Sequence, residues 1–267
     1  MTIRVAFAGA AGRMGRALLK LAAESGDLTI AAAVEAAGRP QLGEDAGSLI
    51  GRAPLGVKLT AAGAPLAADV VVDFSAPAAT LALIEQLSQT PLPLVCGTTG
   101  LEAAHKAALA KLAEAAPVVW APNFSTGVNL LFDLVFRAAA VMGPQTEVEV
   151  VEAHHKHKKD APSGTAVRLV EQVARALNLD AKRDAVHGRE GITGERPLRQ
   201  IGVHALRGGE VVGEHTVFLF GEGERLELTH RAASRDALAA GALRAVRWVV
   251  GRRPGLYDMM DVLGMKG

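Results

Sequence analysis

The amino-acid sequence predicts an α/β protein with two domains, one built on a parallel sheet and the other of α+β type. Three observations lead to this prediction. The chain has 267 residues, which exceeds the common size of a single domain. Short apolar segments alternate with helical segments up to about residue 121. After residue 147, polar and apolar residues alternate instead, as in half-buried strands.

The first part of the chain reads as a repetition of strand and helix. Helices are expected at residues 13–24 and 103–115, and short apolar strands at 3–8, 28–34, 70–74, 94–96 and 118–121. This order is typical of βαβ units, whose strands are parallel. We therefore expect a Rossmann-like, doubly wound sheet and a nucleotide-binding domain.

The pattern changes after Asn123. Apolar residues at helical spacing predict a helix at 128–139, and alternation predicts strands at 147–150, 201–206, 211–220 and 226–230. We expect these strands to form a mostly antiparallel sheet with helices on one face, and Gly208-Gly209 to form a hairpin turn between two of them. A last helix is predicted at 236–250, and its apolar stripe fits a core in either domain.

Composition limits the classes of function. The chain is 49% hydrophobic and 21% charged, which suits a packed core, and its net charge is only +1. A global basic field for nucleic acid or anionic membrane is therefore excluded. The single cysteine, Cys96, excludes an intrachain disulfide and indicates a reducing compartment. Neither a signal peptide nor an apolar stretch of about 18 residues is found, so we expect a cytoplasmic protein that binds no membrane.

A glycine-rich loop follows the first predicted strand directly and opens the first predicted helix. Its residues are Gly9, Ala10, Ala11, Gly12, Arg13, Met14 and Gly15. Small residues let the backbone approach a pyrophosphate, and the helix N-terminus offers unpaired amides with a partial positive charge. The alternative is a tight turn between strand and helix, but the position of the loop favours dinucleotide binding.

Glu35 supports this interpretation, because an acidic residue about 20 positions past such a loop commonly bonds the ribose hydroxyls of the adenosine half. The alternative is a solvated charge at a strand end. Ala36 follows it, so the next residue offers no positive charge for a 2′-phosphate. Arg16 and Arg39 are close enough in sequence to supply one.

Residues 152–166 come directly off a predicted strand and lead into a predicted helix. Positions 154–159 contain three of the eight histidines of the chain and three lysines. This local excess of charge predicts an anion site. The spacing of the histidines does not match the usual metal-ligand patterns, so we expect no metal. A solvated basic loop is the remaining alternative.

The end of this segment favours a catalytic site over a solvated basic loop. Ser163, Gly164 and Thr165 begin a helix, where amides and hydroxyls beside lysines can bind a carboxylate. A histidine with a pKa near neutral is a natural proton donor next to such a site.

These residues resemble the 4-hydroxy-tetrahydrodipicolinate reductase family over essentially the whole chain. The resemblance is carried by seven motifs: GAAGRMGR at Gly9, DFSAP at Asp73, GTTG at Gly97, APNFSTGVN at Ala121, EAHHKHKKDAPSGTA at Glu152, REGITGER at Arg189 and GEHTVFL at Gly213. The histidine-lysine string is highly specific to the family.

The resemblance implies a dinucleotide-binding domain at 1–125 and 236–267, and a substrate-binding domain at 126–235 that forms a homotetramer. It also implies that two segments line the nicotinamide side of the cofactor. They are Gly97, Thr98 and Thr99, and Ala121, Pro122, Asn123 and Phe124. From spacing alone, both segments read equally well as ordinary turns between strand and helix.

The resemblance further implies the reaction, in which NADH or NADPH reduces a small cyclic dicarboxylate and the 4-hydroxyl group leaves as water. His154 matches the proton donor and Lys158 its cationic helper. The substrate-binding residues would be His155, Lys158, Ser163, Gly164 and Thr165. Several relatives carry arginine where this chain has Ala36, so we expect NADH to serve at least as well as NADPH.

Two other functions fit part of the sequence. Another two-domain dehydrogenase, acting on an aspartate-like acid or semialdehyde, explains the glycine loop but not the histidine-lysine string. A nucleotide-sensing regulator would keep the first domain and would need no proton donor.

Overall fold

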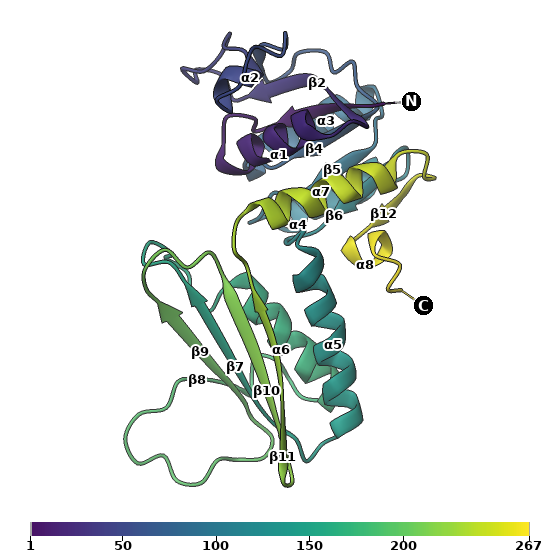
Figure 1. Cartoon of the computed structure of the whole chain (residues 1–267). Coiled ribbons are helices and arrows are strands. Elements are labelled where there is room, and N and C mark those ends of the chain that lie inside the picture. The colour runs from purple at the N-terminus through teal and green to yellow at the C-terminus, as the bar shows by residue number, and fades with distance from the viewer. Residues whose placement is uncertain (1, 267) are drawn as a thin grey trace. The chain divides into compact units, whose positions relative to one another are not determined.

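The computed structural model describes residues 2–266 and divides into two compact units (Figure 1). Unit 1 consists of the chain up to Thr126 and of the chain from Arg235 onward, and unit 2 is Gly127–Ser234. The last long helix, α7 (Asp236–Val249), therefore belongs to unit 1 although it follows unit 2 in the sequence.

A parallel sheet of seven strands forms the centre of unit 1, with the strand order β12-β6-β5-β4-β1-β2-β3. All predicted strands of this domain are present, and β3 and β12, only three residues each, were not predicted. The bounds are β1 Ile3–Ala8, β2 Leu28–Glu35, β3 Leu59–Ala61, β4 Val70–Asp73, β5 Leu94–Cys96, β6 Pro117–Trp120 and β12 Gly255–Tyr257. The strand order reverses between β1 and β4, and ligands bind at such a switch point in open α/β sheets.

Helices cover both faces of this sheet because successive residues of a strand point to opposite sides. Val5 and Phe7 of β1 belong to the apolar cluster that contains α1 and α7, whereas Ala6 belongs to the cluster with α3 and α4. The helices are α1 Arg13–Glu24, α2 Ala46–Leu49, α3 Pro77–Gln89, α4 Ala103–Leu112, α7 and α8 Met259–Val262.

Unit 2 is an α+β domain, as predicted, and its five-stranded sheet is mixed. The strand order is β11-β10-β7-β9-β8. Helices α5 (Thr126–Met142) and α6 (Gly164–Leu177) share one apolar cluster with Val148, Val150 and other residues of one sheet face. The strands are β7 Glu147–His154, β8 Ala185–His187, β9 Ile201–Arg207, β10 Glu214–Gly221 and β11 Glu224–Arg231.

The predicted antiparallel pairing is correct for β10, which pairs with β7 and β11, but wrong for β9. Strand β9 is parallel to both β7 and β8. The connection from β7 to β9 contains α6, and residues 188–200 connect β8 to β9 without a helix; both connections are long enough for the crossover that parallel neighbours need. The hairpin turn at Gly208-Gly209 is also wrong, since β9 and β10 lie on opposite sides of β7. The Gly208 amide instead donates to the His154 carbonyl at 3.0 Å.

Helix α7 packs closely on the segment that follows β6. A Cβ atom added at Gly241 would lie 1.8 Å from the Phe124 carbonyl oxygen, which is a backbone atom and cannot rotate away. Glycine at this helical position therefore serves a close approach.

We predict that Gly241→Ala lowers the free energy of unfolding by about 1–3 kcal/mol through overpacking, despite the better helix propensity of alanine. The denaturant midpoint measures this change. Gly26→Ala is the matched control, because a Cβ at Gly26 would meet no atom within 4 Å. An equal loss in both variants would contradict the packing argument.

Candidate active site

The glycine-rich loop follows β1 at the switch point of the sheet. Gly9 has a φ of 74°, and a Cβ there would lie 2.9 Å from the Phe74 carbonyl oxygen. A Cβ at Gly15 would lie 2.2 Å from the Gly9 carbonyl oxygen, so this glycine lets α1 pack on the loop. Gly12 is the N-cap of α1 and has no side chain to cover the first amides. The loop thus has the space and the donors that a pyrophosphate requires.

Glu35 is buried at the end of β2 and fixed by the loop. Its Oε2 accepts a hydrogen bond from the Ala11 amide at 3.0 Å, and its Oε1 accepts one from the Ala36 amide at 2.9 Å. The Arg39 Nε atom lies 3.7 Å from the same Oε1. The acidic residue and a nearby cation therefore stand together beside the loop.

A cavity of about 360 Å³ opens next to these residues. Gly9, Gly12, Glu35, Ala36 and Arg39 form its polar side, and the lining from β4 and α3 is mainly apolar, with Phe74, Ala79 and Leu83. A cavity of this size with few polar groups suits the adenosine half of a dinucleotide. Sequence reasoning missed the β4–α3 lining, although the DFSAP motif marks its beginning.

The other predicted loop residues have different places. Ala10 is fully buried, Met14 packs against the core, and Arg13 is exposed at the start of α1. Arg16 does not line the cavity; its Nε donates to the Ala11 carbonyl at 3.0 Å.

The two predicted nicotinamide segments lie at the same edge of the sheet. The Gly97 amide donates to the Asp73 carbonyl at 2.9 Å, and the Ala121 amide donates to the Cys96 carbonyl at 3.2 Å. The Phe124 ring centroid is 5.4 Å from that of Phe74. Thr99 and Pro122 are exposed, whereas Asn123 is half-buried and its Oδ1 accepts from the Ser125 amide.

Asp73 is a buried carboxylate that sequence reasoning did not single out. It accepts hydrogen bonds from the Thr98 hydroxyl at 3.1 Å, from the Ser75 amide at 3.0 Å and from the Thr80 hydroxyl. The carboxylate thereby holds the first residues after β4 and β5 together. Burial raises the pKa of the nearby Cys96 thiol, and the Asp73 charge raises it further.

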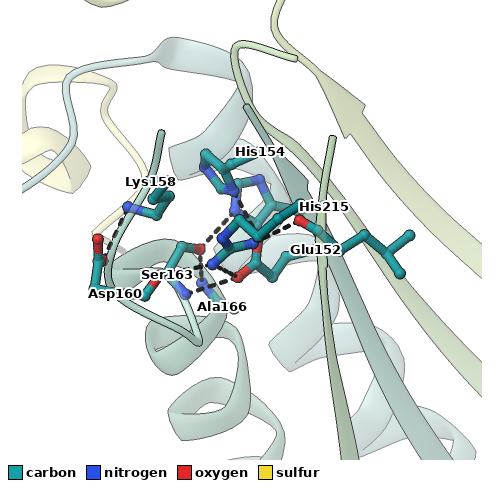
Figure 2. Close-up of polar contacts among 9 residues, drawn as sticks. Glu152, His154, Lys158, Asp160, Ser163, Ala166 and His215 are labelled. Atoms are coloured by element: carbon teal, nitrogen blue, oxygen red, sulfur yellow. Dashed lines mark hydrogen bonds and ion pairs between the residues drawn. The ribbon is translucent and has the colours of Figure 1, made fainter. Parts of the chain in front are cut away.

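In unit 2, Glu152 and His154 lie two residues apart on β7, so their side chains share one face of the strand. The His154 Nδ1 atom lies 2.6 Å from Glu152 Oε2 (Figure 2). Glu152 is fully buried, and Arg207 of β9 binds both carboxylate oxygens at 2.9 and 2.8 Å. Burial raises the pKa of Glu152, but hydrogen bonds from Arg207, His154 and the Ser163 amide lower it by more. The pKa of this carboxyl group therefore lies below its usual value.

Ser163 joins this cluster to helix α6. Its amide donates to Glu152 Oε1 at 3.0 Å, and its hydroxyl oxygen accepts from the Ala166 amide as the N-cap of the helix. The same oxygen lies 3.0 Å from His215 Nε2 of β10 (Figure 2). Burial, together with the neighbouring His154, lowers the pKa of His215 to about 4, so His215 is neutral at pH 7.

The histidine-lysine string divides into inner and outer residues. Lys158 is 20% exposed and its Nζ lies 2.9 Å from Asp160 Oδ2, whereas the side chains of Lys156 and His157 are 62% and 69% exposed. The His155 carbonyl accepts from the Lys158 amide, and its ring lies against that of His157. Gly164 and Thr165 are the first two residues of α6. The structure thus groups His154, Ser163 and the start of α6, and places the His155 ring beside His157.

Three residues of this cluster were missing from the sequence prediction: Glu152, Arg207 and His215. Alternation along the strand could have indicated Glu152, which is two residues from His154. The other two residues, Arg207 and His215, reach the cluster only because their strands, β9 and β10, lie on either side of β7 in the sheet.

Among residues 2–266, no group of three or more His, Cys, Asp or Glu side chains is arranged to hold a metal ion. No helix in this range is long and apolar enough to cross a membrane.

The fold is shared with other solved structures. A myo-inositol dehydrogenase from Corynebacterium glutamicum superposes with a TM-score of 0.61 at 16% identity, covering 96% of this chain and 90% of that one. A dihydrodipicolinate reductase from Paenisporosarcina sp. TG-14, solved with dipicolinate bound, superposes with a TM-score of 0.76 at 23% identity. The superposition covers 98% of this chain and 99% of that one.

Sequence comparison identifies the family. The family models described as dihydrodipicolinate reductase, N-terminus and C-terminus, match residues 3–124 and 127–263. Curated 4-hydroxy-tetrahydrodipicolinate reductases from Anaeromyxobacter dehalogenans and Thiobacillus denitrificans are each 51% identical. The match to the first covers 99% of this chain and 98% of the relative, and the match to the second covers 100% of both. The chain therefore belongs to the dihydrodipicolinate reductase family, whose members are NAD(P)H-dependent oxidoreductases.

Proposed function

We propose that this protein reduces 4-hydroxy-tetrahydrodipicolinate to tetrahydrodipicolinate in lysine and diaminopimelate biosynthesis, with loss of the 4-hydroxyl group as water. The observation that carries the proposal is the cluster of Glu152, His154 and Ser163 beside Lys158, in a chain 51% identical to curated reductases of this name. The dipicolinate bound in one structural relative is likewise a cyclic dicarboxylate.

Unit 1 holds the cofactor in this proposal, with the phosphates at the glycine-rich loop and the nicotinamide near residues 97–99 and 121–124. The bound cofactor supplies the hydride. The remaining tasks of the chain are to hold the two substrate carboxylates, to orient the ring and to deliver a proton.

The start of α6 receives a substrate carboxylate. The amides of Gly164 and Thr165 are at the positive end of the helix dipole, and the Lys158 ammonium group, which also pairs with Asp160, adds positive charge. His155 and the Ser163 and Thr165 hydroxyls complete the proposed substrate-binding set.

His154 supplies the proton. Burial lowers its pKa, and the bond to Glu152 partly opposes this effect. The protonated ring is consequently a stronger acid than a free histidine, and it transfers the proton readily to the substrate carbon.

We also propose that the protein is a cytoplasmic homotetramer assembled through unit 2. The sheet face not covered by α5 and α6 carries an open groove of about 500 Å³ whose lining includes Glu149, Val151, Arg196, Phe218 and Phe220. Phenylalanine and arginine are both enriched at protein–protein interfaces relative to the rest of the surface. The molar mass in light scattering tests the oligomeric state.

The activity test couples the protein to the preceding synthase, fed with pyruvate and aspartate semialdehyde, and follows oxidation of the reduced nicotinamide. Oxidation that depends on the synthase supports the proposed reaction. Oxidation with the semialdehyde alone would instead indicate another dehydrogenase. Cofactor binding without turnover would indicate a nucleotide-sensing regulator.

His154→Gln should lower kcat by roughly 10²- to 10⁴-fold with a small change in KM, because the histidine acts on a proton that moves in the transition state. His157→Gln is the matched control, since this histidine is exposed in the same loop. An unchanged kcat with a raised KM would assign His154 to binding instead.

Lys158→Ala should lower kcat and raise KM, because a charge near the ring carboxylate both binds substrate and stabilises developing charge. Lys156→Ala, which removes an exposed lysine paired with Glu210, should change neither constant. Weaker cofactor binding by the Lys158 variant without substrate would show that the site is misfolded.

The enzyme should use NADH at least as well as NADPH. The Glu35 carboxylate suits free ribose hydroxyls and repels a 2′-phosphate, and Ala36 offers no compensating charge. The difference should be modest, because Arg39 lines the same cavity and its Nε atom lies 3.7 Å from Glu35 Oε1, so that its charge offsets part of the repulsion.

The ratio of kcat/KM for the two cofactors, at low and at moderate salt, measures this preference. Ala36→Arg should raise the value for NADPH and Arg39→Ala should lower it, whereas Arg16→Ala should leave the ratio unchanged. An NADPH preference above about tenfold, roughly 1.4 kcal/mol, would overturn the argument.

A further inference from the structure

The Glu152 carboxylate has a function that goes beyond supporting the fold. Each of its oxygens has two donors. Oε1 accepts from the Ser163 amide at 3.0 Å and from Arg207 Nη2 at 2.8 Å, whereas Oε2 lies 2.6 Å from His154 Nδ1 and accepts from Arg207 Nη1 at 2.9 Å. One buried carboxylate thus connects the proposed proton donor with the helix start that receives the substrate.

We propose that Glu152, held by Arg207, is a positioning residue for the reduction, which selects the nitrogen of His154 that transfers the proton and fixes Ser163 at the start of α6. This inference rests on the proposed function. It adds Glu152 and Arg207 to the residues that the reaction needs, and both act through His154 and Ser163.

The tautomer of His154 follows from the chemistry of its partner. An ionised carboxylate only accepts hydrogen bonds, so Nδ1 must carry the hydrogen and Nε2 becomes the nitrogen that gains and loses the proton. Gly213 lies next to that atom. A Cβ added at Gly213 would lie 3.1 Å from His154 Nε2, so glycine at this position avoids a close contact with Nε2.

Arg207 keeps the carboxylate ionised and in place. Its guanidinium group binds both oxygens in a fork, and it also donates to the Asp160 carbonyl at 2.7 Å, which ties the loop before Ser163 to β9. A bidentate pair of this kind fixes orientation as well as charge.

Charged and titratable groups face His154 from each neighbouring element. They are Glu152 on β7 itself, Arg207 on β9, His215 on β10 with His230 beyond it on β11, and Lys158 and its partner Asp160 in the loop. Burial, Lys158 and Arg207 lower the pKa of His154, and Glu152 raises it. Removing the carboxylate charge therefore lowers this pKa further.

The consequence for activity has a definite sign. The reaction needs protonated His154, so kcat/KM falls as the pH rises above the pKa of His154. In Glu152→Gln this basic limb should move to lower pH by about one unit, and kcat/KM at neutral pH should fall roughly tenfold, with a smaller difference at acidic pH.

Histidine NMR on the complete enzyme without substrate provides a second readout that does not depend on turnover. In the unmodified enzyme, the ¹⁵N shifts of neutral His154 should show the Nδ1–H tautomer. In Glu152→Gln, the titration midpoint of His154 should be lower and the preference for this tautomer should be reduced.

Glu149→Gln is the matched control. Glu149 lies on the same strand and also binds two arginines and a histidine, since Arg189, Arg196 and His204 Nε2 contact its carboxylate at 2.8–3.1 Å. None of these bonds involves His154. Because Glu149 also lines the groove proposed as a subunit interface, its loss should lower the stability of the assembly. It should not move the pH limb or the titration of His154.

The double variant separates action through His154 from a general effect. Glu152→Gln should reduce kcat little further once His154 is glutamine, because the step it supports is already lost. The proposal is overturned if Glu152→Gln lowers activity equally at every pH and leaves the His154 midpoint unchanged. It is also overturned, without any variant, by an Nε2–H tautomer in the unmodified enzyme. Normal turnover by His154→Gln would refute the proton-donor assignment instead, while the NMR result for Glu152 would stand.

Discussion

The buried ion pair between Glu152 and Arg207 organises the candidate site in unit 2. A carboxylate removed from water is costly unless hydrogen bonds and an opposite charge compensate for it. Here the compensation comes from four donors on three segments: β7, β9 and the start of α6. Because each donor must be in place for the carboxylate to be tolerated, the same requirement fixes His154 and Ser163.

Unit 1 uses buried carboxylates in a related way, although within residues 2–266 no lysine or arginine forms an ion pair with Asp73. Hydroxyl groups and an amide from the ends of β4 and β5 bind Asp73, and amides of the glycine-rich loop and of Ala36 bind Glu35. Both residues stand at the carboxyl ends of parallel strands, where backbone amides become available. These hydrogen bonds fix the loops in which we propose that the cofactor binds, and a fixed loop lowers the entropic cost of binding.

The fold alone does not specify the reaction, because a myo-inositol dehydrogenase and a dihydrodipicolinate reductase both superpose on this chain. In the proposed function, the segment from Glu152 to Thr165 carries the proton donor, a cation and the start of α6. Arg207 and His215, on the two strands that flank β7, hold this segment in place.

The sequence by itself determined the parallel sheet of unit 1 and the glycine-rich loop, because these features depend on local periodicity and on a motif whose residues are close in the chain. The roles of His154 and Lys158 stay predictions that the resemblance to the family implies. The tertiary structure decided that β9 runs parallel to β7 and that Arg207 reaches Glu152 across 55 positions and His215 reaches Ser163 across 52. Strand order depends on which long-range pairings bury the most apolar surface with all backbone groups bonded, and no local pattern contains that comparison.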